Sequence, residues 1–440
     1  MFPARNNFGY TGQVPNLANG FRFQQRSPLF GHNMPFIPLY HMPGYQPMGG
    51  MPPRFPVQMP RGPAHANNRG KRRHAPFANP QPSKKARTSD SHLSLQEVAP
   101  DEEGKRYKVP VSQGTEKITV AIWNYFLRAQ MTDEDLKKKM KLRKSLHTIF
   151  EGAFPGCRLF IVGSSMTGFA TKSSDVDMCF MISEKEIDQK GDATFILSLI
   201  AKALGRCSFV RSPLVIRAKV PILKFEDRNS GVECDLNINN TIGIRNTHLL
   251  RHYAYMDWRV RPLMLFIKRW ARYHDINDAS KKTISSYSLS LMLIHYLQAG
   301  VRPAVLPCLQ NLQPDMFSSS RDVRKLSLSM EDVVDFSSQN AATLGELFLG
   351  FLNYYANVFN YDDVISIRMG KKLNPREAYQ CGIDIMQWKN LRIEEPFEGS
   401  NTARSVYDVH VFWRILRVIR ASFTALKQSR DVDSILSRPF

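Results

Sequence analysis

The amino-acid sequence predicts an α+β protein, in which a small mixed α+β unit (residues 142–240) is joined to a larger helical unit (residues 241–430). Short apolar segments rich in β-branched residues lie between residues 158 and 238, which is typical of strands. After residue 240, apolar residues recur at helical spacing instead. The composition of the first 105 residues, in contrast, is unsuited to a packed core, so folding is expected to begin only after them.

Residues 1–105 are expected to form a disordered tail. Fifteen of the 27 prolines lie in the first 82 positions, among Gly, Met, Asn and aromatic residues. The first acidic residue is Asp90, whereas twelve Lys or Arg precede it and supply more than half of the net charge of +21. The basic clusters at 71–73 and 84–87 have the spacing of a bipartite nuclear-import signal, although a generic basic tail explains them equally well.

The composition also limits the class of protein. A net charge of +21 favours a polyanionic partner such as RNA over a charge that serves solubility alone. The six cysteines are far apart, with no Cys-x-x-Cys pair and no His at zinc-site spacing, so we expect reduced thiols. The sequence has no apolar run of about 18 residues and no signal-peptide core at its start. We therefore expect an intracellular protein without a membrane anchor.

Two helices are predicted to precede the α+β unit, in residues 106–141, and to pack on the helical central unit, with the pattern of the second continuing to Phe150. In residues 115–130, Ile118, Ile122 and Phe126 recur at four-residue spacing. Thr132 can begin the second helix, whose apolar positions are Leu136, Met140, Leu146 and Phe150. Within the α+β unit, the predicted elements are strands at 158–162, 177–182, 217–225 and 231–238 and a helix at 193–204.

The helical unit is predicted from capping residues and apolar stripes. Pro262 suits the first turn of one helix, and Ser285 can cap another that Gly300 closes. Residues 344–359 form a further apolar helix. A long helix is predicted at 405–428, before a short tail at 431–440, and its expected buried side consists of Val409, Phe412, Trp413, Leu416, Ile419 and Phe423.

The segment from Phe160 to Phe180 carries the most informative pattern. A predicted strand runs into Gly163-Ser164-Ser165, where small residues would let backbone N–H groups approach phosphate oxygens. Asp175 and Asp177 follow where the next strand begins, and residues two apart on a strand point to the same face. Two carboxylates so close together repel each other unless a cation lies between them, and Mg²⁺ prefers such oxygen ligands.

A third carboxylate completes a two-metal site. Asp235 is a charged residue in an otherwise apolar predicted strand, which would be costly without a partner. A metal ion explains it, because one ion of a two-metal pair also contacts the attacking hydroxyl. The alternative is a salt bridge, for example to Lys219. Taken together with the Gly-Ser turn, the three aspartates favour the metal site.

This order of motifs resembles the DNA polymerase β-type nucleotidyltransferase superfamily. Asp235-Leu-Asn-Ile-Asn-Asn, Lys268-Arg-Trp-Ala and Glu394-Glu-Pro-Phe-Glu-Gly-Ser-Asn are similar to motifs of the germline-type cytoplasmic poly(A) polymerases of animals, and the resemblance covers about residues 110–430. It implies a small mixed-sheet palm domain packed against a larger helical, PAP-associated central domain, with a cleft between them. Thr167 and Ala170 depart from the Asn and Gly that these enzymes often have there.

The resemblance also implies roles for the nucleotide-binding residues. The matching positions are Gly163, Ser164, Lys268 and Ser286 for the triphosphate, Asn246 and Thr247 for the ribose, and Tyr287 for stacking on the base. Arg272 shares a helix face with Lys268. Without the family, helix capping, a solvated helix face and ordinary core packing would explain these residues as well.

The choice of base is predicted from the motif that contains Glu395 and Glu398. Related uridylyltransferases have a His directly after this motif, at the position of Asn401. The resemblance therefore implies ATP as substrate.

The sequence thus predicts a poly(A) RNA polymerase that adds AMP to mRNA 3′ ends without a template, with Mg²⁺ as its metal and Mn²⁺ as the alternative. It contains no dedicated RNA-binding module, so RNA-binding adaptor proteins are expected to recruit a monomeric catalytic subunit into a heteromeric complex. Its expected location is the cytoplasm, and also the nucleus if the basic clusters act in import. The alternatives are a terminal uridylyltransferase, a non-enzymatic scaffold and a basic protein whose tail binds RNA.

Overall fold

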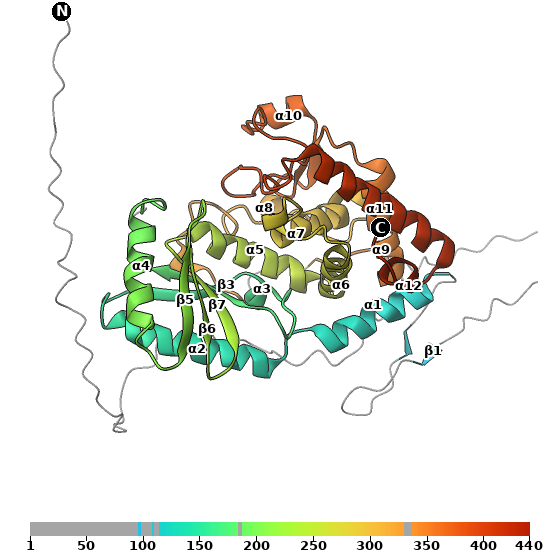
Figure 1. The fold of residues 1–440 in the computed structure, drawn as a ribbon. Helices are drawn as coiled ribbons and strands as arrows, with labels where there is room; N and C mark the ends of the chain where they lie inside the picture. The colour runs from blue at the N-terminus through green and yellow to red at the C-terminus, as the bar shows by residue number, and fades with distance from the viewer. Residues whose placement is uncertain (1–95, 98–107, 110–113, 184–186, 330–335) are drawn as a thin grey trace, which may run out of the picture.

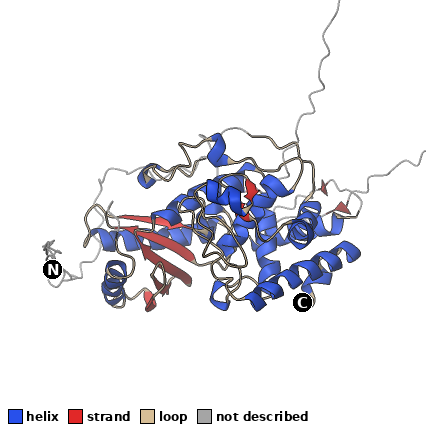
Figure 2. Cartoon of the chain, turned by 90° about the horizontal axis from the view of Figure 1, so that it is seen from above, coloured by secondary structure: helices blue, strands red, loops and turns tan. Residues whose placement is uncertain are grey.

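The structure is a computed structural model, and it describes residues 96–97, 108–109, 114–183, 187–329 and 336–440. Most of the predicted disordered tail, including both basic clusters, lies outside the described residues. In the described part, a sheet with two flanking helices occupies one end of the molecule and the remaining helices fill the other end (Figure 1 and Figure 2). This arrangement confirms the predicted α+β class.

The sheet has five strands in the order β3-β4-β7-β6-β5. They are β3 (Arg158–Val162), β4 (Val176–Met181), β5 (Val210–Ile216), β6 (Ile222–Asp227) and β7 (Val232–Ile238). β4 and β7 run parallel, whereas the other neighbours are antiparallel, so the sheet is mixed as the resemblance implied. A smaller antiparallel pair joins β1 (Gln96–Glu97) to β2 (Lys108–Val109).

The edge strand β5 was not predicted. It is mostly exposed, contains Pro213 and has a register shift between Arg211 and Leu214, so it lacks the alternating pattern of a half-buried strand. The prediction of a strand at 217–225 was correspondingly wrong at its start. Residues 217–221 form the connection from β5, and β6 begins only at Ile222.

The two faces of the sheet have different compositions. One face packs against α2 (Asp133–Glu151) and α4 (Asp192–Leu204), with Leu146 and Leu197 among the buried contacts. On the opposite face, Asp177 and Asp235 alternate with the core residues of β4 and β7. Part of this second face is covered by α5 (Thr241–Met256) through Ile244.

The two predicted N-terminal helices pack in different places. α1 (Glu116–Ala129) lies against α6 (Val260–Tyr273) and α9 (Leu344–Asn353), in the helical unit. α2 begins with the capping box formed by Thr132 and Asp135 and packs on the sheet. The domain boundary drawn at residue 142 therefore falls inside a continuous helix, all of which belongs with the sheet.

The helical unit has one large core. Its other helices are α7 (Ser286–His295), α8 (Leu309–Leu312), α10 (Pro375–Gln380), α11 (Val409–Ser429) and α12 (Asp433–Leu436). Its short elements are η2 (Ala279–Lys281), η3 (Tyr296–Gly300), η4 (Val323–Lys325), η5 (Tyr354–Val358), β8 (Val364–Ser366) and β9 (Lys371–Leu373). The predicted cap Ser285 accepts a hydrogen bond from the Ser288 N–H. The predicted helices 285–300 and 344–359 both end in π-helical turns, η3 and η5.

The long helix α11 lies on the outside of the helical unit, and its predicted buried face was too wide. Trp413 is 53% exposed and Val409 is 46% exposed, whereas Phe412, Leu416 and Ile419 are buried. An outer helix contacts the core along one stripe only, so the apolar residues beside that stripe stay accessible.

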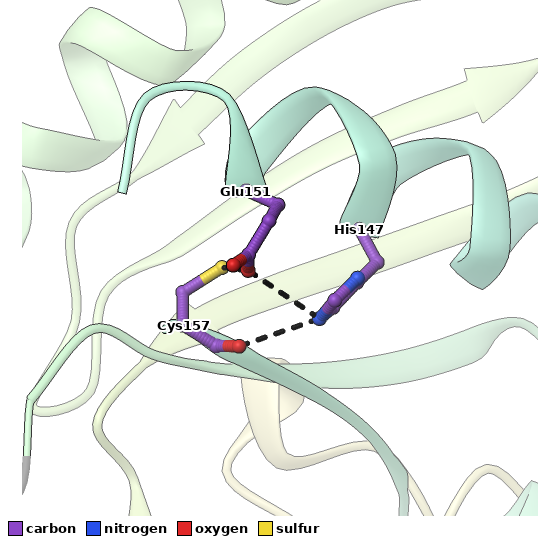
Figure 3. A group of neighbouring side chains, drawn as sticks. All are labelled: His147, Glu151 and Cys157. Carbon is purple, nitrogen blue, oxygen red and sulfur yellow. Dashed lines mark hydrogen bonds and ion pairs between the residues drawn. The ribbon is translucent and has the colours of Figure 1, made fainter. Parts of the chain in front are cut away.

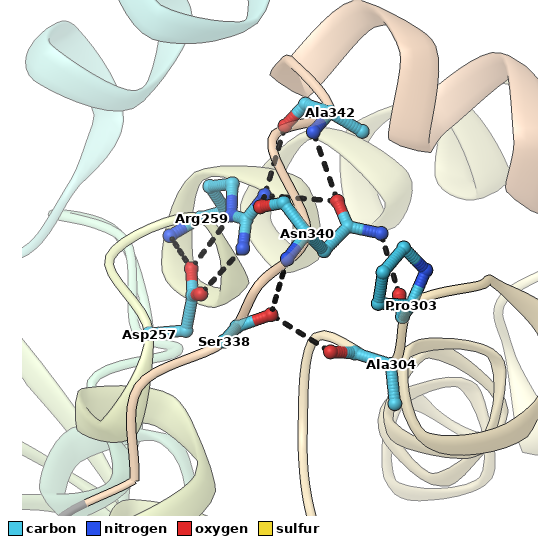
Figure 4. Close-up of polar contacts among 7 residues, drawn as sticks. All are labelled: Asp257, Arg259, Pro303, Ala304, Ser338, Asn340 and Ala342. Carbon is cyan, nitrogen blue, oxygen red and sulfur yellow. Dashed lines mark hydrogen bonds and ion pairs between the residues drawn. The ribbon is translucent and has the colours of Figure 1, made fainter. Parts of the chain in front are cut away.

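A buried ion pair helps to organise the helical unit. The Arg259 guanidinium donates to both carboxylate oxygens of Asp257, at 2.9 and 2.7 Å. It also donates to the backbone oxygens of Asn340 and Ala342 and to the Asn340 Oδ1. Figure 4 shows how this cluster fixes the loop before α9 against the start of α6. The side chains of the cluster are all engaged with protein groups.

Among the described residues, no helix has the length and apolar character needed to cross a membrane. All six cysteines are free, in agreement with the expected reduced thiols.

Candidate active site

A cavity of about 950 Å³ lies between the polar face of the sheet and the helical unit. The sheet unit contributes residues of α2, β4, β7 and α3 (Ser164–Thr167), and the helical unit contributes residues of α5, α6 and α7. Asp175 and Asp177 line this cleft, and Asp235 lies directly beside Asp177 without lining it. The acidic motif and the predicted nucleotide-binding helices therefore meet at one place.

The three aspartates are brought together by strand register. Asp177 of β4 and Asp235 of β7 are direct Cα partners in the parallel pair, so their side chains share a face. Asp175 precedes β4 by one residue and lies two residues before Asp177. On the far side of Asp235, its register partner in β6 is Lys224.

Gly163 is required by the close approach of Asp177. Its φ is +68°, and a Cβ placed on it would lie 2.5 Å from an Asp177 carboxylate oxygen. The Gly163 N–H donates to the Thr247 Oγ1 at 2.8 Å, and that hydroxyl donates in turn to the Gly243 carbonyl. The turn predicted to bind phosphate is thus attached both to an acidic residue and to α5.

The acidic cluster is electrostatically strained without a cation. Burial, together with the charges of Asp175 and Asp235, raises the pKa of Asp177 to about 7. Burial also raises the pKa of Asp235, although Lys224 opposes this. The Asp235 Oδ1 is buried without a hydrogen-bond partner and lies 3.7 Å from the Lys224 Nζ. The suggested alternative partner of Asp235, Lys219, pairs instead with Glu398 at 3.7 Å.

These observations fit a divalent cation. The salt-bridge alternative for Asp235 is met only by a long ion pair, because its buried Oδ1 has no hydrogen bond and lies 3.7 Å from the Lys224 Nζ. Three neighbouring carboxylates with such an oxygen are the donor set that Mg²⁺ or Mn²⁺ takes in proteins. The oxygens of the three aspartates do not all lie within 4.8 Å of one another, as mutual repulsion leads one to expect.

A different group, His147, Glu151 and Cys157, does have ligand atoms within 4.8 Å of one another. Figure 3 shows that these side chains contact each other between the end of α2 and the start of β3. Glu151 accepts hydrogen bonds from the Gly156 N–H and the Cys157 thiol. Burial and the nearby Glu151 carboxylate raise the pKa of Cys157 to about 12, so the thiol stays protonated. Through these hydrogen bonds the group stabilises the turn between α2 and β3.

Most of the predicted nucleotide-binding residues line the cleft. They are Gly163, Ser164, Asn246, Thr247, Lys268, Arg272, Ser286 and Tyr287. Lys268 is buried, donates to the Phe169 carbonyl at 3.2 Å, and has its pKa lowered to about 8, first by burial and then by Arg272. The Asn246 Oδ1 is buried and has no hydrogen-bond partner, which suits an acceptor for a ligand hydroxyl. The Thr247 hydroxyl, in contrast, is already engaged with Gly163 and Gly243.

Glu395, Glu398 and Asn401 do not line the cavity, although all three were predicted to bind the nucleotide. The Glu395 carboxylate accepts hydrogen bonds from the Tyr287 hydroxyl and from two backbone N–H groups of its own loop. The Asn401 amide accepts from the Ile393 and Ala403 N–H groups and donates to the Leu391 carbonyl. In this structure Glu395 positions Tyr287, and Asn401 stabilises its own loop. Glu398 instead accepts from the Ser400 hydroxyl and pairs with Lys219.

Among the cleft residues that sequence reasoning missed, two are buried polar residues close to the aspartates, Lys139 and Asn237. Lys139 is 1% exposed, and its Nζ donates to the Ser165 Oγ at 3.0 Å and the Asp175 carbonyl at 3.1 Å. Its helical spacing from Leu142 and Leu146 could have revealed it, because the three residues share one buried stripe of α2. The predicted stripe instead contained Met140, which is 37% exposed. The second residue is Asn237, two residues after Asp235 on the same face of β7.

The mixed sheet, its acidic row and the cleft against a helical unit define a nucleotidyltransferase of the template-independent RNA-modifying class. Residues 118–255 match the family described as poly(A) RNA polymerase, mitochondrial-like, central palm domain. Residues 343–401 match the Cid1 family of poly(A) polymerases.

The chain belongs to the GLD2 family of poly(A) RNA polymerases. It is 44% identical to GLD2 of Danio rerio over 326 residues, which are 73% of this chain and 65% of that protein. It is also 44% identical to GLD2 of Mus musculus, over 75% of this chain and 68% of that protein. The chain thus spans about two thirds of the length of these relatives.

Solved structures show the same fold. A GLD-2/RNP-8 complex matches with a TM-score of 0.66 and 43% identity, covering 73% of this chain and 98% of that chain. The Cid1 poly(U) polymerase bound to Mg and 3′-dATP matches with a TM-score of 0.61 and 27% identity, covering 73% and 98%. The family resemblance predicted from the motifs is therefore confirmed.

Proposed function

We propose that this chain is the catalytic subunit of a poly(A) RNA polymerase that transfers AMP from ATP to RNA 3′ ends without a template. The observation that carries the proposal is the row formed by Asp177 and Asp235 beside Asp175, at a cleft that also contains Lys268 and Tyr287. A scaffold would have no need for adjacent, partly buried carboxylates with a raised pKa. Family membership makes adenylate transfer the expected chemistry.

In the proposed reaction, the RNA 3′ oxygen forms a bond to the α-phosphorus of ATP, and the bond from that phosphorus to the bridging oxygen breaks, so that pyrophosphate leaves. Asp175, Asp177 and Asp235 would hold the divalent ions, with Mg²⁺ as the proposed metal. Such ions lower the pKa of an attacking hydroxyl and neutralise the charge of a leaving pyrophosphate.

The other cleft residues would bind and orient the substrates. Lys268 and Arg272 present positive charge to the triphosphate from one face of α6. Tyr287, held by Glu395, would stack on the base, and the Asn246 Oδ1 would accept a hydrogen bond from the ribose of ATP. Because these groups are fixed by the fold, substrate positioning would supply a large part of the rate.

ATP is proposed over UTP because Asn401 stands where related uridylyltransferases have a His. The Asn401 side chain is bonded within its own loop and presents no imidazole to a base. The competing function is that of a terminal uridylyltransferase, and the structural likeness to the Cid1 poly(U) polymerase supports it as the alternative.

Extension of a labelled RNA oligonucleotide with each of the four NTPs, separately and in competition, tests this assignment. We expect extension with ATP and none with the Asp177→Asn variant. A preference for UTP would replace the proposal with uridylyl transfer. RNA binding without extension by any NTP would leave a scaffold. The remaining alternative is a basic protein that acts through RNA binding by its tail. Removing residues 1–105 tests it, because RNA binding would then be lost, whereas a polymerase should still extend RNA at the cleft.

We also propose that adaptor proteins deliver the RNA. Two structural relatives are GLD-2 complexes, one with RNP-8 and one with GLD-3. Outside the first 89 residues the net charge is only about +9, which would hold RNA weakly and without sequence choice. Tethering the chain to a reporter RNA should therefore raise processivity well above that on free RNA. Equal processivity would contradict recruitment. A cytoplasmic location, with import through the basic clusters, remains part of this proposal.

A further inference from the structure

The cleft contains a second side-chain amide, that of Asn237, to which the proposed reaction assigns no role. Asn237 is 8% exposed and lines the cavity, and its Oδ1 is buried without a hydrogen-bond partner. Buried acceptors in folded proteins are rarely left unpaired, because the lost hydration of the oxygen is not replaced. A group that enters the cleft would satisfy this oxygen.

The position of Asn237 limits what that group can be. Asp235 and Asn237 are two residues apart on β7 and point to the same face, about 7 Å apart along the strand. Core residues Cys234, Leu236 and Ile238 point to the other face. A molecule held at Asp235 that extends along the strand therefore meets the Asn237 amide next.

On the proposed function, on which this inference rests, the RNA 3′-hydroxyl is the group placed beside Asp235. The ribose that carries this hydroxyl also carries a 2′-hydroxyl on the neighbouring carbon. That 2′-hydroxyl can donate to an amide oxygen, and it is the group by which a protein distinguishes RNA from DNA at a given position.

Two ribose groups meet in the reaction, and among the described residues two amide oxygens of the cleft are buried and unpartnered. One is the Asn246 Oδ1, on α5 next to Thr247, the other residue predicted to contact the ribose of ATP. The other is the Asn237 Oδ1, on the strand of Asp235. We infer that Asn237 binds the 2′-hydroxyl of the terminal ribose of the RNA primer, and that this contact makes the enzyme select RNA over DNA ends.

The test uses the full-length chain with ATP and Mg²⁺ on three matched oligonucleotides. One is all RNA, one has a 2′-deoxy sugar at the terminal position with its 3′-hydroxyl intact, and one has the 2′-deoxy sugar at the next position inward. We expect the terminal change to lower kcat/KM for the primer by about 3- to 10-fold, as one hydrogen bond allows. The inward change should have no comparable effect.

Two variants of similar size separate the two riboses. Asn237→Leu should bring the ratio between all-RNA and terminally 2′-deoxy primers close to one, and leave the ratio between ATP and dATP as in the wild type. Asn246→Leu should do the reverse. Fluorescence anisotropy of the same labelled primers, measured without ATP, should show the primer discrimination and its loss in Asn237→Leu as a ratio of Kd values. Asn237→Ala serves as a second variant if the leucine disturbs the strand.

The outcomes are distinguishable. If no NTP extends the all-RNA primer, the proposed function fails. If the wild type extends primers with and without the terminal 2′-hydroxyl equally well, the assignment of Asn237 is overturned and the polymerase function stands. A change of the ATP-to-dATP ratio in Asn237→Leu, with primer discrimination intact, would also overturn the assignment, because Asn237 would then contact the nucleotide.

Discussion

Two regions of this molecule contain buried polar side chains, and they differ in whether those polar groups have partners within the protein. Around Arg259, the guanidinium is paired with Asp257 and bonded to Asn340, and every side chain of that cluster is engaged within the protein (Figure 4). In the cleft, Asn237 and Asn246 each have a buried oxygen without a hydrogen-bond partner, and beside it the buried Asp235 Oδ1 has only a 3.7 Å ion pair to Lys224. The first region stabilises the fold, whereas the second leaves binding capacity for a ligand.

The difference shows that burial of a charge is by itself no sign of function. The group of His147, Glu151 and Cys157 has the geometry of a metal site but satisfies its own polar atoms, as the Arg259 cluster does (Figure 3). In the aspartate cluster, burial and neighbouring carboxylates instead raise the pKa of Asp177 and of Asp235. Substitutions in the two regions should therefore affect stability and activity in opposite ways.

Asp177→Asn should have the largest effect on activity. Loss of a central metal ligand should lower kcat by about a thousandfold or more, since several kcal/mol of charge stabilisation disappear. The same change should raise the melting temperature of the metal-free protein at pH 8. The raised pKa of Asp177, about 7, means that the folded state holds an extra proton between about pH 4 and 7, so its stability falls as the pH rises through that window. A lower melting temperature for the variant would contradict this.

Arg259→Leu should show the opposite behaviour. It leaves the carboxylate of Asp257, only 11% exposed, without its cation, and breaking a buried pair in this way costs about 3–5 kcal/mol. Urea denaturation should show this loss, while kcat per folded molecule stays close to the wild-type value. A fall in kcat without a loss of stability would place Arg259 with the cleft instead.

Lys268→Met should act on nucleotide binding. Lys268 has one hydrogen bond, to the Phe169 carbonyl, and otherwise faces the cleft, so its ammonium is available to a triphosphate. We expect KM for ATP to rise about 10- to 100-fold, the range for a charge-assisted contact in a partly dry site. Arg269→Met, on the exposed side of the same helix, is the matched control and should leave KM unchanged. Equal effects of both changes would indicate general loss of positive charge.

The metal requirement should depend on pH. Because Asp177 titrates near pH 7 in the metal-free protein, a metal ion must displace a proton below that pH. The half-saturating concentration of Mn²⁺ should therefore rise about tenfold per pH unit below 7 and level off above about pH 8. Isothermal titration at pH 6 should show release of protons on metal binding, whereas a flat profile from pH 6 to 8 would refute the raised pKa.

The smallest effect is expected for His147→Ala. Removal of the contact with the Cys157 carbonyl should cost about 1 kcal/mol of stability, the usual value for one hydrogen bond. The metal requirement of the polymerase reaction should not change. An altered Mn²⁺ dependence in this variant would make the group a second functional metal site.

Much of the cleft could be predicted from the sequence because its residues occur in short motifs. Asp175 and Asp177 are two apart, and the row with Asp235 requires only that two strands be neighbours. Lys139 and Asn237 were missed for a different reason. One lies in a run of three lysines, and the other follows an acidic residue in a strand, so only their burial and partners in the folded chain distinguish them.

The fold could be predicted where a local sequence pattern determines an element. The prediction failed where the structure of a segment depends on the elements packed beside it. The buried strands β3, β4 and β7 were placed within a residue or so, because an apolar core on one face imposes their pattern. The edge strand β5 has no such constraint. The roles of Glu395 and Asn401 also depend on which loop atoms surround their side chains, and no motif specifies those atoms.

The short chain of hydrogen bonds from Gly163 through Thr247 to Gly243 has a mechanical consequence. It links the turn beside the proposed metal ligands to the first turns of α5, and so resists sliding of the sheet past the helical unit at this point. If the cleft opens to admit RNA and closes around it, we expect the movement to be a rotation about this connection.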